Sequence, residues 1–205
     1  MTIESIMALA PVIPVLVLDS AHDPAELAST LVAAGLPAIE VTLRTPGALT
    51  AIEAMSAIPG AVVGAGTVLD AAQLDDALGA GARFIVSPGL TEPLAKAAIE
   101  SAIPFLPGVA TAADIMRGLD LGLARFKFFP AVAAGGIPAL KALSAPFAGL
   151  RFCPTGGITA ATARDWLALE AVACVGGSWI VPNGATLAEI GELARQAAAL
   201  SDPTN

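Results

Sequence analysis

Residues 38–68 read AIEVTLRTPGALTAIEAMSAIPGAVVGAGTV, with a short apolar run at each end and an alanine-rich segment between them. The two runs, Ala38–Leu43 and Ala61–Val68, have the length and composition of strands that are buried on both faces. The middle segment is typical of a helix, and Thr45 before Pro46 is a suitable helix start. The stretch therefore predicts one strand–helix–strand unit of a parallel sheet.

The same unit recurs along the chain. Six further apolar runs are Val12–Leu18, Phe84–Ser87, Phe105–Val109, Arg125–Phe129, Leu150–Pro154 and Ala171–Val175. Each precedes a segment rich in alanine, leucine and glutamate, and Asp23 and Thr91 are plausible caps of two of the helices. Eight such units predict an α/β fold, a single-domain (β/α)8 TIM barrel.

The barrel is expected to span residues 1–205, with a short N-terminal helix within residues 1–10, near Ile3–Leu9, and a frayed tail at residues 202–205. A doubly wound open sheet is the alternative. It is disfavoured because no G-x-G-x-x-G motif follows a strand, and Gly64-Ala65-Gly66 matches only the G-x-G part.

The bulk composition restricts the possible partners. Hydrophobic residues make up 56% of the chain, charged residues 14%, and the net charge is −8. So few basic residues disfavour nucleic acid as a partner. Prolines and glycines interrupt the longest uncharged windows, which disfavours a membrane span, and Glu4 stands where a secretory signal would carry basic residues. We expect a cytoplasmic protein, and the sparse charge predicts that another subunit covers part of its surface.

Cysteine and histidine are scarce. Cys153 and Cys174 both lie in apolar runs, so they are interpreted as reduced core residues and not as a disulfide framework. His22 is the only histidine, so a Ser-His-Asp triad would depend on it alone. No cluster of metal ligands is expected.

Polar side chains follow or interrupt several predicted strands, and chemistry in such barrels lies at the carboxyl ends of the strands. Glu40, Thr42 and Arg44 alternate with apolar residues, so they share one face, which points into the barrel or its mouth. A buried carboxylate needs a partner. An ion pair that serves only the core is the alternative explanation of Glu40.

Lys127 lies between phenylalanines in Arg125-Phe126-Lys127-Phe128-Phe129-Pro130. A lysine seldom occupies a buried strand for packing alone, although its stem can also extend to the rim. Apolar surroundings favour the neutral amine, which adds to a ketone and forms an iminium. The iminium accepts electrons when a C–C bond breaks, so Lys127 is predicted to be a Schiff-base lysine.

Glycines follow the seventh and eighth predicted strands, in Thr155-Gly156-Gly157 and Gly176-Gly177-Ser178. Such loops, leading into helix N-termini, commonly bind phosphate in these barrels because backbone N–H groups can approach its oxygens closely. One lysine, one carboxylate, one arginine and two glycine loops together favour a Schiff-base aldolase with a phosphorylated keto-acid substrate.

The chain also resembles a known family, the KDPG/KHG class I aldolases, which act on 2-keto-3-deoxy-6-phosphogluconate. The similar segments are Glu40–Arg44, Val63–Val68, Ser87–Leu90, Phe126–Pro130, Phe152–Gly157 and Gly176–Trp179. They keep their order and extend over nearly the whole chain.

The resemblance implies that Lys127 carries the Schiff base and that Glu40 is the general acid and base. It implies that Arg44 and Thr67 hold the keto-acid carboxylate, that Pro88 and Phe129 line the pyruvate end, that Thr155 contacts substrate oxygens, and that Gly156, Gly157, Gly177 and Ser178 bind the phosphate. It also implies no cofactor beyond the covalent Schiff base, no metal, and a homotrimer.

The sequence departs from the family pattern at two positions. Val17 stands where part of the family has an arginine, and Val132 follows Pro130-Ala131 where the family commonly has a glutamate. Another branch of the family has an apolar residue at the position of Val17, so that change marks a branch, whereas Val132 leaves the preferred acceptor open. The alternative substrates are 4-hydroxy-2-oxoglutarate and the galactonate epimer, and an engineered acceptor specificity is a further alternative. Isomerisation of a phosphosugar with Glu40 as base, and a barrel redesigned as an assembly subunit, are the further alternatives.

Overall fold

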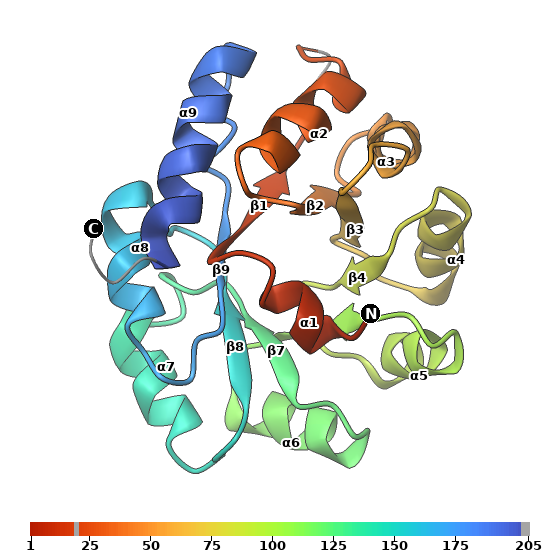
Figure 1. Ribbon diagram of the computed structural model, residues 1–205. Coiled ribbons are helices and arrows are strands. Elements are labelled where there is room, and N and C mark those ends of the chain that lie inside the picture. Colours follow the sequence, from red (N-terminus) through yellow and green to blue (C-terminus); the bar gives the residue numbers. More distant parts are fainter. Residues whose placement is uncertain (19–20, 202–205) are drawn as a thin grey trace.

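The structure is a computed structural model that describes residues 1–18 and 21–201 (Figure 1). The strands are β1 (Val12–Leu16), β2 (Ala38–Thr42), β3 (Val62–Gly66), β4 (Phe84–Val86), β5 (Phe105–Leu106), β6 (Gly108–Val109), β7 (Arg125–Phe128), β8 (Arg151–Pro154) and β9 (Val175–Gly177). The helices are α1 (Ile3–Met7), α2 (Pro24–Ala33), α3 (Ala48–Ser56), α4 (Ala71–Gly79), α5 (Glu92–Glu100), α6 (Ala112–Asp120), α7 (Gly136–Ser144), α8 (Ala160–Leu167) and α9 (Leu187–Ala198), followed by a 3-10 turn, η1 (Ala199–Ser201).

All strand pairs are parallel. One sheet has the order β5-β4-β3-β2-β1-β9, and a second has the order β6-β7-β8. Only Pro107 separates β5 from β6, and single bridges join Phe152 of β8 to Val172 and Thr155 to Gly176 of β9. The first strand therefore pairs with the last, which makes the doubly wound open sheet wrong. The fold is a mixed α/β domain with a curled parallel sheet inside and helices outside (Figure 1).

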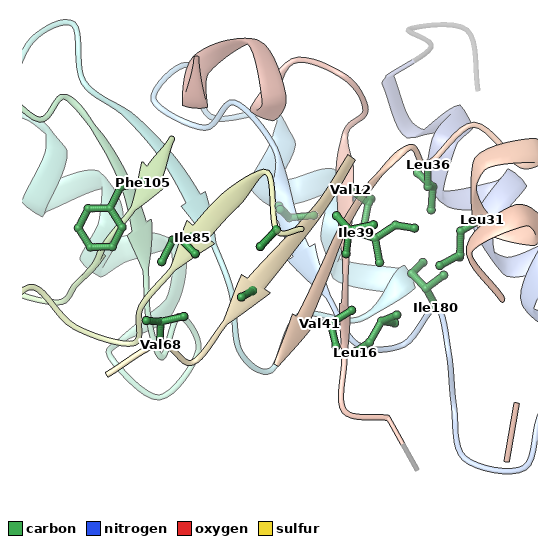
Figure 2. Close-up of a cluster of buried hydrophobic side chains, with 14 of the residues drawn as sticks. Val12, Leu16, Leu31, Leu36, Ile39, Val41, Val68, Ile85, Phe105 and Ile180 are labelled. Atoms are coloured by element: carbon green, nitrogen blue, oxygen red, sulfur yellow. The ribbon is translucent and has the colours of Figure 1, made fainter. Parts of the chain in front are cut away.

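A core of apolar side chains fills the space between the strands and the outer helices. Val12, Ile39 and Ile85 point outward from their strands, and Figure 2 shows them in one layer, with Leu31 of α2 beside it. Alternate residues of each strand face the other way. Packing of the outward side chains against the helices therefore determines which side chains of each strand point inward.

A second, smaller apolar cluster lies on the inner face. Ala38, Val62 and Phe84 contribute to it, and Ile6 and Met7 of α1 belong to the same cluster. Glu4 of α1 also forms an ion pair with Arg125 at the start of β7. Because these positions come early in the strands, α1 closes the amino ends and the interior below the functional residues is apolar.

Several predicted boundaries are confirmed. The N-terminal helix is present as Ile3–Met7. Asp23 caps α2, and its side chain accepts a hydrogen bond from the Glu26 N–H. Thr91 is the N-cap residue of α5, but its side chain makes no capping hydrogen bond. The expected tail at residues 202–205 lies outside the described residues.

Other boundaries were predicted wrongly. Thr45 does not cap α3, because its carbonyl accepts from the Ala48 N–H in a separate turn and Gly47 becomes the N-cap. The last strand is Val175–Gly177 and not Ala171–Val175, because hydrogen-bond pairing of Val175 with Val12 sets its position. None of the helices among the described residues is long and apolar enough to cross a bilayer.

Candidate active site

Strand β2 directs Glu40 into the interior. All five residues of β2 are buried, and Ile39 and Val41 belong to the outward-facing core. Glu40 and Thr42 therefore face inward, and the Thr42 hydroxyl donates a hydrogen bond to the Leu16 carbonyl at 2.8 Å. Packing of the two apolar residues thus fixes where the carboxylate of Glu40 lies.

Strand β7 directs Lys127 into the same space. Phe126 and Phe128 are fully buried on the outer face, so the side chain between them points inward. The register pairs Lys127 with Gly108 on β6 and with Cys153 on β8. Because Lys127 is buried, the interpretation that its stem extends to the rim is wrong.

Lys127 and Glu40 form a buried pair. Nζ of Lys127 lies 2.9 Å from Oε1 and 3.3 Å from Oε2 of Glu40. The two side chains are only 6% and 4% exposed. Nζ also lies 5.4 Å from the centre of the Phe129 ring, within range of a cation–π contact. Transfer of one proton across the 2.9 Å contact converts the ion pair into a neutral amine and a carboxylic acid, which are a nucleophile and a proton donor.

Thr155 follows β8 directly, two residues after Cys153, the register partner of Lys127. It is buried, and it bridges to Gly176 on β9. A Cβ atom at position 176 would lie 2.2 Å from the Thr155 hydroxyl oxygen, so glycine is needed there. The hydroxyl is thereby held on the inner face, near the register position of Lys127.

The Gly156-Gly157 loop has a left-handed backbone, with φ values of 105° and 79°. The N–H groups of Ala131 and Val132 donate to the carbonyls of Thr155 and Gly156, which ties this loop to the chain after β7. The Val132 side chain is 50% exposed and lies against Gly157. Val132, one of the two residues that depart from the family pattern, therefore borders the predicted phosphate loop.

The remaining predicted residues also follow the carboxyl ends of strands. Arg44 is exposed in the turn after β2, Pro88 is half-buried after β4, and Ser178 is exposed after β9. Thr67, directly after β3, has a φ of 61°, a left-handed conformation that strains a β-branched residue. Gly177 is the last residue of β9 and does not lead directly into a helix, since α9 begins only at Leu187.

Three residues have structural roles that the sequence analysis did not assign to them. The Ser87 hydroxyl is buried and donates to the Gly89 carbonyl at 2.7 Å, which shapes the loop that carries Pro88. Gly66 and Gly176 leave room for Glu40 and Thr155 respectively. The available signal was a glycine inside a strand, which often marks close approach of another group.

The two thiols are part of the inner apolar cluster. Cys153 and Cys174 are free and buried, as predicted. A hydrogen bond with the Cys153 thiol, together with burial, raises the pKa of the Cys174 thiol well above its ordinary value. Within residues 1–18 and 21–201, no three His, Cys, Asp or Glu side chains are grouped so that they could hold a metal ion.

A groove of about 680 Å3 lies at the opposite end of the strands. Apolar residues at the ends of α1, α8 and α9 and in the segments that follow these helices line most of it, with Arg164 as the charged side chain. No acidic side chain is among its lining residues, so this groove does not contain a buried acid–base pair like that of Lys127 and Glu40.

The structure thus brings a lysine and a glutamate together as a buried pair inside a curled parallel sheet. Residues 3–195 match the family model of KDPG and KHG aldolases. The chain therefore belongs to the KDPG and KHG aldolase family.

Individual relatives agree with this assignment. The 2-dehydro-3-deoxy-phosphogluconate aldolase of Zymomonas mobilis is 57% identical over 198 residues, 96% of this chain and 95% of that protein. The crystal structure of 2-keto-3-deoxy-6-phospho-gluconate aldolase from Zymomonas mobilis ATCC 29191 has a TM-score of 0.96 at 55% identity and covers both chains completely. The KDPG aldolase of Legionella pneumophila, with pyruvate captured as a covalent carbinolamine, has a TM-score of 0.93 at 46% identity over 97% of this chain and 98% of that one.

Proposed function

We propose that the protein is a Schiff-base aldolase that reversibly cleaves 2-keto-3-deoxy-6-phosphogluconate to pyruvate and D-glyceraldehyde 3-phosphate. The observation that carries the proposal is the buried contact of 2.9 Å between Nζ of Lys127 and the Glu40 carboxylate. The family assignment supports the same reaction. No cofactor is needed, because the protein supplies both the nucleophile and the proton donor.

The reaction begins at the C2 carbonyl of the substrate. The neutral amine of Lys127 adds to C2 and forms a carbinolamine, and Glu40 delivers the proton with which the hydroxyl leaves as water. An iminium linked to Lys127 results. Its positive charge is balanced by the Glu40 carboxylate, which has lost its proton in this step.

Cleavage follows at the C3–C4 bond. Glu40 takes the proton of the C4 hydroxyl, directly or through water, and the bond's electron pair moves toward the iminium nitrogen. The aldehyde leaves and an enamine remains. Protonation of the enamine at C3 and hydrolysis of the resulting iminium release pyruvate and restore the amine.

The other residues bind the two ends of the substrate. Arg44 is proposed to hold the carboxylate, a planar group that suits a guanidinium, with Thr67 as a second donor. Pro88 and Phe129 line the pyruvate end. Thr155 contacts substrate oxygens, and Gly156, Gly157, Gly177 and Ser178 bind the phosphate, largely through backbone N–H groups.

The mechanism is tested by incubation with pyruvate and borohydride. We expect a reduced pyruvate adduct on Lys127, located by peptide mass spectrometry, and no adduct in Lys127→Ala. An adduct confined to Lys96 or Lys141, or no adduct at all, would refute the Schiff-base role.

Substrate choice is tested by pyruvate release from both C4 epimers of the phosphorylated acid and from 4-hydroxy-2-oxoglutarate. The family model includes aldolases of the latter keto acid, which makes it a second candidate substrate. Faster cleavage of the galactonate epimer would correct the proposed substrate and leave the lysine chemistry intact. Turnover of a phosphosugar that survives treatment with pyruvate and borohydride would favour isomerisation instead.

The proposal also covers the closure of the barrel, the oligomeric state and the cellular location. The bridges at Phe152 and Thr155 and the continuity of β5 and β6 support one closed (β/α)8 barrel. The exposed side chains of Met116 and Leu119 on α6 and the low charge content support a homotrimer, which light scattering measures and distinguishes from a larger assembly. A cytoplasmic location follows from the small-molecule metabolism of this family.

A further inference from the structure

Gly66 is the last residue of β3 and pairs in register with Thr42 of β2. Its φ lies outside the left-handed region, so the backbone conformation alone does not require glycine there. Glycine weakens a strand, because it loses more entropy on folding and has no side chain to pack. A different reason for glycine at this position is therefore needed.

The neighbour of Gly66 supplies that reason. A Cβ atom at position 66 would lie 2.2 Å from Oε1, 2.6 Å from Cγ and 2.7 Å from Cδ of Glu40. Ordinary contacts between such atoms are about 3.5 Å, so the Glu40 side chain would have to move by about 1 Å. Oε1 is also the oxygen that lies 2.9 Å from Nζ of Lys127. The backbone of β3 and the lysine amine thus hold the same carboxylate oxygen.

We propose that Gly66 is a positioning residue that holds the Glu40 carboxylate within proton-transfer distance of Lys127. Gly66 does not touch the reacting atoms; it acts through Glu40 by leaving the space that the carboxylate occupies. The inference rests on the proposed function, because it assigns the proton transfers to Glu40.

Two other glycines provide matched controls. Gly64 lies two residues earlier on the same face of β3, and a Cβ there would lie 2.5 Å from the ring of Phe84, which is fully buried. A buried ring cannot move away easily, so Gly64→Ala should affect stability. Gly66→Ala meets the flexible end of a side chain and should mainly displace the carboxylate. Gly79 in α4 has nothing within 4 Å of its Cβ position, so Gly79→Ala should keep the wild-type exchange rate and, because alanine favours a helix more than glycine, unfold at the same or a slightly higher temperature.

The decisive experiment measures exchange of the pyruvate C3 protons for deuterium by NMR, together with the rate of borohydride trapping and thermal unfolding. Exchange needs both the Lys127 iminium and the Glu40 base. We expect Gly66→Ala to remain folded and to lose about 100-fold in exchange rate, as for a catalytic group misplaced by about 1 Å. Gly64→Ala should unfold at lower temperature and keep nearly the wild-type exchange rate per folded molecule.

The Glu40→Ala background separates a positioning effect from a general one. Glu40→Ala removes all three atoms that the new Cβ would meet, so adding Gly66→Ala should change the trapping rate less than threefold there. The inference would be overturned if Gly66→Ala lowered the trapping rate by the same factor in the wild-type protein and in Glu40→Ala. It would also be overturned if Gly66→Ala alone kept the wild-type rate of proton exchange.

Whether the variants fold also tests the inference. If Gly66→Ala alone failed to fold but folded together with Glu40→Ala, the collision with Glu40 would be the cause, which supports the inference. Failure to fold in both backgrounds would overturn it. A wild-type protein that shows neither adduct nor exchange would refute the proposed function itself, before any variant is compared.

Discussion

Replacement of Lys127 by methionine should destabilise the protein far more than loss of an exposed lysine. Nζ and Oε1 are 2.9 Å apart. At an effective dielectric constant of about 20, their attraction amounts to about 6 kcal/mol. Removal of two charges from water costs several kcal/mol for each ion, so the intact pair contributes little compared with two apolar residues. Lys127→Met leaves Glu40 buried without its partner, and such a loss typically costs about 3–5 kcal/mol.

Four proteins measure this effect by guanidinium unfolding, followed by circular dichroism: wild type, Lys127→Met, Glu40→Gln and the double variant. Each single variant should lose about 3–5 kcal/mol, while the double variant should lose clearly less than the sum, because neither charge remains unpaired. All three variants should lack aldolase activity.

Lys96 provides the matched control. It pairs with Glu92 at 2.6 Å, but the two side chains are 56% and 68% exposed. Lys96→Met should therefore leave the free energy of unfolding close to that of wild type, because water screens an exposed pair. The reasoning is refuted if Lys127→Met costs no more than Lys96→Met, or if the double variant loses the full sum of the single losses.

Two further predictions concern Thr67 and the thiols. Thr67→Gly should leave the free energy of unfolding within about 1 kcal/mol of wild type, because relief of the left-handed strain at a φ of 61° offsets the greater entropy of unfolded glycine. Its KM for the keto acid should rise at least about tenfold through loss of a hydrogen bond to a charged group, whereas Thr67→Ser should keep the wild-type KM; an unchanged KM in Thr67→Gly would contradict the carboxylate-binding role. Because the Cys153 hydrogen bond and burial raise the pKa of Cys174, this thiol should resist iodoacetamide at pH 9 in the native protein and react in guanidinium, as counted by mass spectrometry. The unfolded thiol ionises first, so this contribution to stability is full below about pH 8.5 and declines above it; rapid alkylation of the native protein would contradict the argument.

Much of the fold could be predicted because its signals are local in the sequence. Apolar runs alternate with alanine-rich segments, and each run except Ala171–Val175, which reaches β9 only at Val175, became a strand or a strand pair. Helix and strand ends were less predictable, since they depend on contacts from elsewhere. The start of β9 is set by pairing of Val175 with Val12, and glycines at its end weaken the local strand signal.

Lys127 and Glu40 could be found from sequence because a charged residue between apolar neighbours on a buried strand is itself unusual. Their pairing required the register of separate strands. Lys127 and Glu40 are far apart in the chain, and a shift of one residue in either strand would turn one side chain outward. The pairing therefore depends on the packing of Ile39, Val41, Phe126 and Phe128 against the outer helices.

The interior glycine Gly66 affects where the Glu40 carboxylate lies, in addition to the direction in which the Glu40 side chain points. Outward packing decides which way Glu40 points, but it leaves the carboxylate free to choose among side-chain conformations. The missing side chain at Gly66 makes one of these conformations available, because the Glu40 carboxylate occupies the space that a Cβ atom at position 66 would fill. A residue without side-chain chemistry can thus determine where a proton is transferred. For this reason, catalytic geometry in such a sheet is encoded as much in its small residues as in its charged ones.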